Sequence, residues 1–192
     1  MKKLILLFIT TSFVLSQNLI WSVDEKYENG NIKAISYHQK VWQKIELVKK
    51  ETYYENGQIK GEQNFKDGKE DGKYVEYYEN GQIKEEVNSK YGEMEGRGRR
   101  YYENGQIKEE GNFKDGKIDG KYTSYYENGQ ILREENYKYG ELDGKWTSYY
   151  ENGKIKKEGN YKDGKEDGKW TGYLNNGQIK TEETYKDGKL VE

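Results

Sequence analysis

The sequence predicts an all-β protein, an elongated single-sheet array of antiparallel β-hairpins with a 24-residue period. Three observations predict this fold. Two series of turn-forming glycines run in phase along the chain, aromatic residues reach 15% and gather between them, and proline, which interrupts β-ladders, is absent. The first series is Gly30, Gly57, Gly81, Gly105, Gly129, Gly153 and Gly177, and the second is Gly68, Gly92, Gly116, Gly140, Gly164 and Gly188.

One repeat shows how the glycines divide strands from turns. Asn152-Gly153 is a strong signal for a tight type I′ turn, in which both residues need a positive φ. The flanking segments KWTSYY and KIKKEGNY have the length and composition of strands. Asp163-Gly164 and Asp167-Gly168 are expected to form a looser connection to the next hairpin.

Alternation along the strands assigns the side chains to two faces. An isoleucine column and an aromatic column are expected to share one face as an apolar spine. A column of glutamates with lysines is expected on the other face, which is solvated and where unlike charges pair across strands. The spine columns are Ile32, Ile59, Ile83, Ile107, Ile131, Ile155 and Ile179, and Phe65, Phe113, Tyr137, Tyr161 and Tyr185. The charged columns are Glu62, Glu86, Glu110, Glu134, Glu158 and Glu182, and Lys60, Lys84, Lys108, Lys156 and Lys180.

Residues 1–16 have the three-part layout of a secretory signal peptide. Lys2 and Lys3 form a basic start, an apolar stretch follows, and Val14 and Ser16 are small residues before a cleavage point. The apolar stretch is shorter than the roughly 20 residues that a spanning helix needs. We therefore expect export to the periplasm, the cell surface or the medium, and an uncleaved anchor is the alternative.

Two further segments follow the signal peptide. Residues 17–50 are expected to form an irregular N-terminal capping unit, because AISYHQKVWQKIELVKK replaces the second turn motif with a longer and more apolar segment. Residues 51–192 are expected to form the regular array.

The composition excludes several classes of function. Charged residues make up 35% and the mean hydropathy is −1.29, values typical of disorder, but the many aromatic residues recur at a fixed period and indicate a folded chain. The formal net charge is −2, without the basic excess of a nucleic-acid-binding protein. The absence of cysteine excludes disulfides, zinc–thiolate sites and thiol nucleophiles.

From Tyr27 to Leu190 the chain repeats a tyrosine, an Asn-Gly turn, a strand, an Asp-Gly turn and Gly-Lys-Trp or Gly-Lys-Tyr. This order resembles the bacterial MORN-repeat variant family. The resemblance implies a MORN-like repeat solenoid, and a scaffold that binds proteins or, in some members, acidic phospholipids. Some bacterial members are labelled antitoxin-like, and the signal peptide departs from that label, since a neutraliser of a cytosolic toxin would not be exported.

No catalytic, cofactor or metal site is predicted, and the chain is interpreted as a non-enzyme. His38 is the single histidine and has no evident acid or nucleophile partner. Paired carboxylates such as Glu109-Glu110 recur beside lysines, which favours solvated charge over glycosidase chemistry. Asp67-Gly68 with Asp71 falls short of a calcium-loop spacing, and turn formation explains these residues.

Two sets of residues are candidates for an interaction surface. The first residues of the Tyr-Tyr pairs are predicted to form an exposed ladder, if the second residues (Tyr54, Tyr78, Tyr102, Tyr126 and Tyr150) enter the spine; sheet-stabilising packing is the alternative. The ladder is Tyr53, Tyr77, Tyr101, Tyr125 and Tyr149. The second set is Arg97, Arg99 and Arg100, which surround Gly98 where another repeat has an aromatic residue, and drift in one repeat is the alternative.

The favoured function is a scaffold for protein–protein interaction in the cell envelope or outside the cell, with the partner docked on the aromatic face by several weak contacts. Binding of a polysaccharide or of the cell wall is the first alternative, because stacked rings suit sugars. Binding of acidic lipids is the second, and the acidic net charge opposes it.

Overall fold

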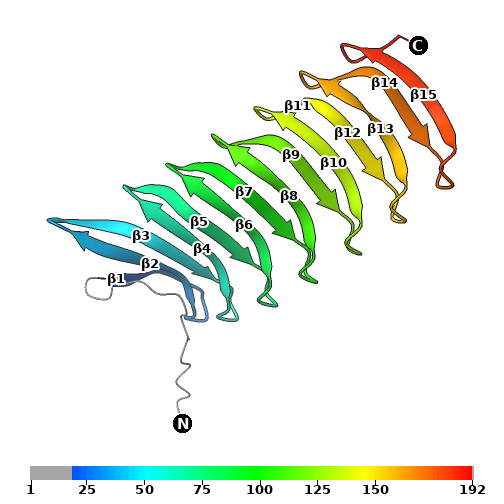
Figure 1. Ribbon diagram of the computed structural model, residues 1–192. Coiled ribbons are helices and arrows are strands. Elements are labelled where there is room, and N and C mark those ends of the chain that lie inside the picture. Colours follow the sequence, from blue (N-terminus) through cyan, green and yellow to red (C-terminus); the bar gives the residue numbers. More distant parts are fainter. Residues whose placement is uncertain (1–18, 192) are drawn as a thin grey trace.

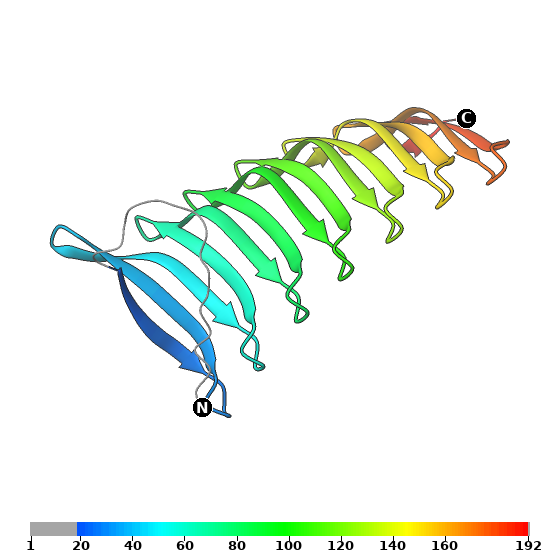
Figure 2. The same cartoon turned by 60° about the horizontal axis from the view of Figure 1, so that its bottom comes forward.

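The structure, a computed structural model, describes residues 19–191 and forms one continuous antiparallel β-sheet (Figure 1). Its 16 strands follow one another in chain order, with the two-residue strand β11 paired to β10 beside the main path. The sheet is a long, bowed single layer, and no helix lies over either face in the described part of the chain (Figure 2). The predicted single-sheet array with its 24-residue period is confirmed, whereas the predicted signal peptide at residues 1–16 lies outside the described residues.

Most strands are eight to ten residues long. Their bounds are β1 (Leu19–Lys26), β2 (Ile32–Val41), β3 (Lys44–Tyr53), β4 (Ile59–Lys66), β5 (Lys69–Tyr77), β6 (Ile83–Lys90), β7 (Glu93–Tyr101), β8 (Ile107–Lys114), β9 (Lys117–Tyr125), β10 (Ile131–Lys138), β11 (Glu141–Leu142), β12 (Gly144–Tyr149), β13 (Ile155–Lys162), β14 (Lys165–Tyr173), β15 (Ile179–Lys186) and β16 (Lys189–Leu190).

The tight two-residue turns of the repeats are at the second glycine series, as Asp-Gly or, at Tyr91-Gly92 and Tyr139-Gly140, as Tyr-Gly, and not at Asn-Gly as predicted. Lys162 pairs with Lys165, which leaves only Asp163 and Gly164 between the strands, with φ of 48° and 75°. Positive φ at both positions defines a type I′ turn. Gly168, predicted to belong to the same connection, lies inside β14 at a bulge with φ of 76°.

The Asn-Gly segment is a five-residue loop. Of its two residues only Gly153 has a positive φ, and its N–H donates to the carbonyl of Tyr150 at 2.9 Å. The Asn152 side chain instead accepts a hydrogen bond from the N–H of Lys154 at 3.1 Å. An asparagine side chain can thus hold a longer loop as well as enter a type I′ turn, which is why the dipeptide alone misled the prediction.

A bulge beside each Asn-Gly loop changes which residues share a face. Tyr149 pairs with Ile155 while the preceding Ser148 pairs with Lys157, so Lys156 has no partner of its own. One extra residue reverses the alternation that follows it. The isoleucine column therefore shares a face with the glutamate column, and the column of Lys156 shares a face with the aromatic column. The predicted placement of these two columns is wrong, and the same shift recurs in the other repeats.

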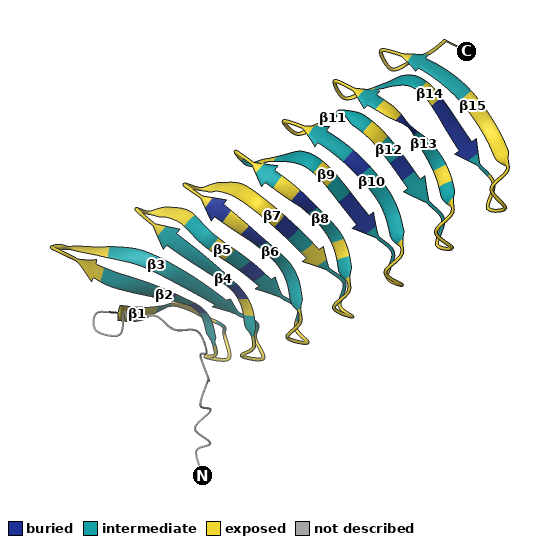
Figure 3. Ribbon diagram, viewed as in Figure 1, coloured by how far each residue is buried: buried dark blue, intermediate teal, exposed yellow. Residues whose placement is uncertain are grey.

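The face with the aromatic column, here called the ring face, carries the closest apolar packing. Trp170 is 1% exposed, and its ring centroid lies 5.4 Å from that of Trp146 and 5.2 Å from that of Tyr161. The Trp170 ring also covers Gly159, where an added Cβ would lie 2.1 Å from the ring. Buried residues form short stretches within the strands, and the loops are exposed (Figure 3). The opposite side is called the glutamate face.

Residues 19–50 continue the sheet as β1, β2 and β3. Strands β2 and β3 form a longer hairpin than the others, with Trp42 at its turn, 92% exposed. β1 is the outermost strand, and Leu19, Ile20 and Trp21 are exposed there. This segment is placed in the plane of the array, and its predicted role as a cap stays a prediction.

Candidate interaction surfaces

A chain of polar contacts crosses the glutamate face. Glu134 on β10 forms an ion pair with Lys121 on the strand before it and accepts a hydrogen bond from the Tyr149 hydroxyl on the strand after it, at 2.8 Å. The hydrogen bond from Lys121, supported by Tyr149, lowers the pKa of Glu134 although burial opposes the shift. Burial and the bond to Glu134 raise the pKa of Tyr149 to about 12. One carboxylate thus ties together three consecutive strands.

The same contacts recur in the other repeats, and we call them the Lys–Glu–Tyr ladder. The equivalent sets are Lys49–Glu62–Tyr77, Lys73–Glu86–Tyr101, Arg97–Glu110–Tyr125 and Lys145–Glu158–Tyr173. Cross-strand pairing of the glutamate column is therefore confirmed. Its partners are not the predicted lysine column, because the bulge moves that column to the ring face.

The candidate tyrosines Tyr53, Tyr77, Tyr101, Tyr125 and Tyr149 all lie on the glutamate face and are half-buried. Each hydroxyl donates to a glutamate, so the rings lie against the sheet and do not project freely. The structure thus brings these residues together in one column. Their side chains are half-buried, whereas the sequence predicted that they would be exposed. That the column binds a partner stays a prediction.

The second tyrosines of the pairs lie in the loops and not in a spine. The Tyr150 hydroxyl donates to the backbone carbonyl of Tyr173 in the next repeat at 2.7 Å. Tyr54, Tyr78, Tyr102 and Tyr126 make the same bond to the following repeat. The prediction for these residues is wrong because the strand ends one residue before them. Their recurrence just before Glu-Asn-Gly was the signal that could have identified this role.

The three candidate arginines do not form one cluster. Arg97 and Arg99 lie on the glutamate face, where both pair with Glu110, at 2.5 and 3.3 Å. Arg100 lies on the ring face between Glu85 and Glu109, at 3.3 and 3.5 Å. Alternation separates them, since adjacent residues of a strand point to opposite faces.

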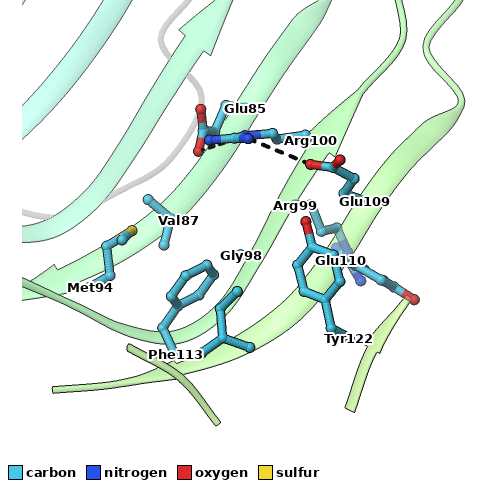
Figure 4. A pocket seen from close by; sticks show the side chains of 11 residues that line it. Glu85, Val87, Met94, Gly98, Arg99, Arg100, Glu109, Glu110, Phe113 and Tyr122 are labelled. Atoms are coloured by element: carbon cyan, nitrogen blue, oxygen red, sulfur yellow. Dashed lines mark hydrogen bonds and ion pairs between the residues drawn. The ribbon is translucent and has the colours of Figure 1, made fainter. Parts of the chain in front are cut away.

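A hollow of about 160 Å³ opens on the ring face beside Gly98 (Figure 4). Its apolar lining includes Val87, Met94 and Phe113. The ion pairs of Arg100 with two glutamates form its charged end, as the dashed lines in Figure 4 show. The sequence indicated the missing ring at Gly98, but it did not indicate that apolar side chains from β6 and β8 meet around the gap.

The described residues 19–191 contain no group of three or more histidine, cysteine, aspartate or glutamate side chains suited to a metal ion. His38 lies on β2 between Ile20 and Leu47 of the neighbouring strands. Asp71 accepts a hydrogen bond from the N–H of Tyr91 in the next turn at 3.4 Å, a structural role for this aspartate. Over the same residues, no helix is long and apolar enough to cross a membrane.

Comparison with known proteins identifies the repeats. The family described as MORN repeat variant matches six consecutive segments, residues 48–67, 70–91, 94–115, 118–139, 142–163 and 166–187. No curated protein matches the sequence significantly. Among solved structures, a protein of unknown function from Bacteroides fragilis is similar at 8% identity and a TM-score of 0.19, over 88% of this chain and 94% of that chain. A TM-score this low supports no conclusion about fold or function.

Proposed function

Because the chain belongs to the MORN repeat variant family, we propose that it is an exported, non-catalytic scaffold that binds a protein partner. One observation carries the proposal: both faces of a single-layer sheet present half-exposed rings and charges at a fixed spacing along the whole array. Such a surface offers a partner many weak contacts in register, whose strengths combine when they are made together. Tyrosine suits this role because it provides a rigid, amphipathic contact area.

Within the regular repeats, the state of the two tryptophans favours a protein over a glycan; the exposed Trp21 and Trp42 lie outside these repeats, in β1 and at the turn between β2 and β3. Sugar stacking needs open ring faces, but Trp170 is buried, and Trp146 is half-buried with its indole N–H donating to Glu135 at 3.0 Å. The charge balance of 33 basic to 35 acidic residues also lacks the excess that draws a protein to anionic lipids.

Export rests on the signal-like segment at residues 1–16. Fractionation of the native host, with N-terminal sequencing of the recovered protein, tests this part of the proposal. Recovery from the envelope or the medium with a new N-terminus after Ser16 supports it. A cytosolic protein that retains Lys2 and Lys3 contradicts it.

Crosslinking in the native host, followed by identification of the captured protein, tests the scaffold. We expect the double variant Tyr125→Ser, Tyr149→Ser to capture at least tenfold less of the partner that the wild type captures. The matched control Tyr125→Phe, Tyr149→Phe keeps the rings but loses the bonds to glutamate, and it should retain most of the capture. Circular dichroism is used to check that both variants are folded. Equal capture by the serine variant excludes the tyrosine ladder as the docking surface, and a wild type that captures no protein refutes the scaffold.

A further inference from the structure

One position of the ring face is vacant in a column that is otherwise filled. The column crosses the first strand of each repeat at Tyr74, Gly98, Tyr122, Trp146 and Trp170. Gly98 is the single member without a ring, and it lies beside the hollow of about 160 Å³. A cavity of about 150 Å³ lined by apolar side chains is large enough to hold a benzene ring. The hollow is therefore large enough to hold a phenyl ring.

Neighbouring repeats show where a ring in this position rests. An added Cβ on Gly111 would lie 2.5 Å from Cδ2 of Tyr122, so the Tyr122 ring covers the preceding strand. The residue 24 positions before Gly111 is Val87, which lines the hollow. A ring attached at Gly98 would accordingly lie over Val87, and the Phe113 ring, 2.7 Å from an added Cβ at Gly98, would have to move aside (Figure 4).

The charged residues at one end of the hollow indicate which kind of aromatic side chain fits there. Tyr122 and Glu109 both line the hollow, and burial, supported by the carboxylate of Glu109, raises the pKa of Tyr122. Glu85 stands 24 residues before Glu109 and lines the hollow in the equivalent position. A phenol ring in the hollow could therefore donate its hydroxyl to Glu85, as tyrosines of this protein do to glutamates on the other face.

The tryptophan repeats have the opposite charge at this position. Arg133 and Lys157 stand there, and the Lys157 ammonium lies 4.6 Å from the centroid of the Trp170 ring. In the repeat of Tyr74 the position is Gly61, which carries no charge. At this position a carboxylate stands beside Tyr122 and beside no tryptophan, although the indole N–H of Trp146 donates to another carboxylate, that of Glu135. A ring with a hydroxyl donor therefore fits Glu85.

We infer that the hollow beside Gly98 binds a tyrosine side chain of the protein partner, with the ring on Val87 and the hydroxyl donating to Glu85. The inference deepens the proposed scaffold function and rests on it. Arg100 holds the Glu85 carboxylate at the end of the hollow, at 3.3 Å, and still leaves it lone pairs to accept the phenol. The partner completes the column that this chain leaves open, and it thereby docks in a defined register.

Nuclear magnetic resonance with the purified protein and p-cresol, the side-chain analogue of tyrosine, tests the site. We expect p-cresol to shift the signals of Val87 and Met94 with a Kd on the order of 1 mM. Toluene, which lacks the donor, should bind at least fivefold more weakly. A capped Gly-Gly-Tyr-Gly-Gly peptide should bind at least as tightly as p-cresol. If p-cresol binds and the peptide does not, the ring does not come from a protein and the inference is overturned.

Two variants make the test specific. Gly98→Tyr fills the hollow from within the chain and should abolish the shifts; the backbone there accepts a side chain, and the ring of Phe113 is the nearest group that must move. Glu85→Ala should weaken p-cresol at least fivefold and leave toluene unchanged, while the control Glu76→Ala, on the same face but paired with Lys84, should have no effect. Shifts that persist in Gly98→Tyr overturn the inference.

Capture of the partner by Gly98→Tyr tests the scaffold function separately from the hollow. If Gly98→Tyr loses p-cresol but captures the partner in the native host as well as the wild type, the hollow is not the docking point and the inference is wrong, although the scaffold function stands. If the variant loses both, the inference is supported.

Discussion

The Lys–Glu–Tyr ladder leads to a prediction about how the polar face stabilises the sheet. In the variant Tyr149→Phe the ring remains and one hydrogen bond to Glu134, at 2.8 Å, is lost. Hydrogen bonds to charged groups contribute about 1.5–3 kcal/mol to stability, and partial exposure of both side chains reduces this figure to about 1 kcal/mol. We expect Tyr149→Phe to lower the free energy of unfolding by that amount at pH 7.

A double-mutant cycle with Glu134→Gln isolates the pair. The coupling energy between the two substitutions should be about 1 kcal/mol, measured by urea unfolding followed by circular dichroism. Tyr150→Phe is the matched control, because its hydroxyl bonds to the backbone carbonyl of Tyr173 at 2.7 Å and not to Glu134. Its coupling to Glu134→Gln should be close to zero, although the single substitution costs about 0.5–1.5 kcal/mol.

The same pair predicts the direction of the pH dependence. The pKa of Glu134 is lowered in the folded protein, so its contribution is complete above the ordinary glutamate pKa of about 4.3 and is lost as the pH falls through the lowered value. The difference between wild type and Tyr149→Phe should therefore shrink in acid. A difference that is unchanged at pH 2, or a coupling energy below about 0.3 kcal/mol at pH 7, would refute the view that the ladder stabilises the sheet.

Two further predictions concern the packing and the alkaline limit of the fold. Gly159→Ala should destabilise the protein more than Gly164→Ala in urea unfolding: the first Cβ would meet the Trp170 ring at 2.1 Å, whereas the second has open space and costs only the strain of a positive φ, about 1–2 kcal/mol. Equal losses would show that the tryptophan moves aside freely. Burial together with glutamate partners raises the pKa of Tyr77 and Tyr149 to about 12, so their contribution is complete below about pH 10 and should disappear as the pH rises through 12, which spectrophotometric titration of the tyrosines can follow.

The period made the fold predictable, but it left the roles of the two turns interchangeable. Both Asn152-Gly153 and Asp163-Gly164 are turn dipeptides, and the number of residues between the paired strands decides which one forms the type I′ turn. That number depends on strand register, which is set by contacts between repeats and is not visible within one repeat.

The candidate surface, like the fold, was predictable as far as it follows from the 24-residue period. The tyrosine column follows from the period alone, but its burial depends on glutamates from the preceding repeat, and the isoleucines that share its face are placed there by a bulge at Lys156. A bulge adds one residue without changing the spacing of the repeat, so alternation counted along the sequence assigns the wrong face on one side of it. The missing ring at Gly98 was visible because it breaks the period, whereas the residues that line the hollow come from four different strands, β6 to β9.

The architecture explains why the array tolerates a gap in its middle. Each strand is paired only with its neighbours in the sheet, and the side-chain bonds between repeats are local, as for Tyr149 to Glu134 and Tyr150 to Tyr173, which span 15 and 23 residues. In such a nearly one-dimensional protein the stability is close to a sum of local terms. The missing ring at Gly98 therefore weakens one interface, while the Lys–Glu–Tyr ladder on the opposite face continues past it through Arg97, Glu110 and Tyr125. The polar contacts that hold the sheet together on one face thus continue through the same repeat in which the other face has its hollow.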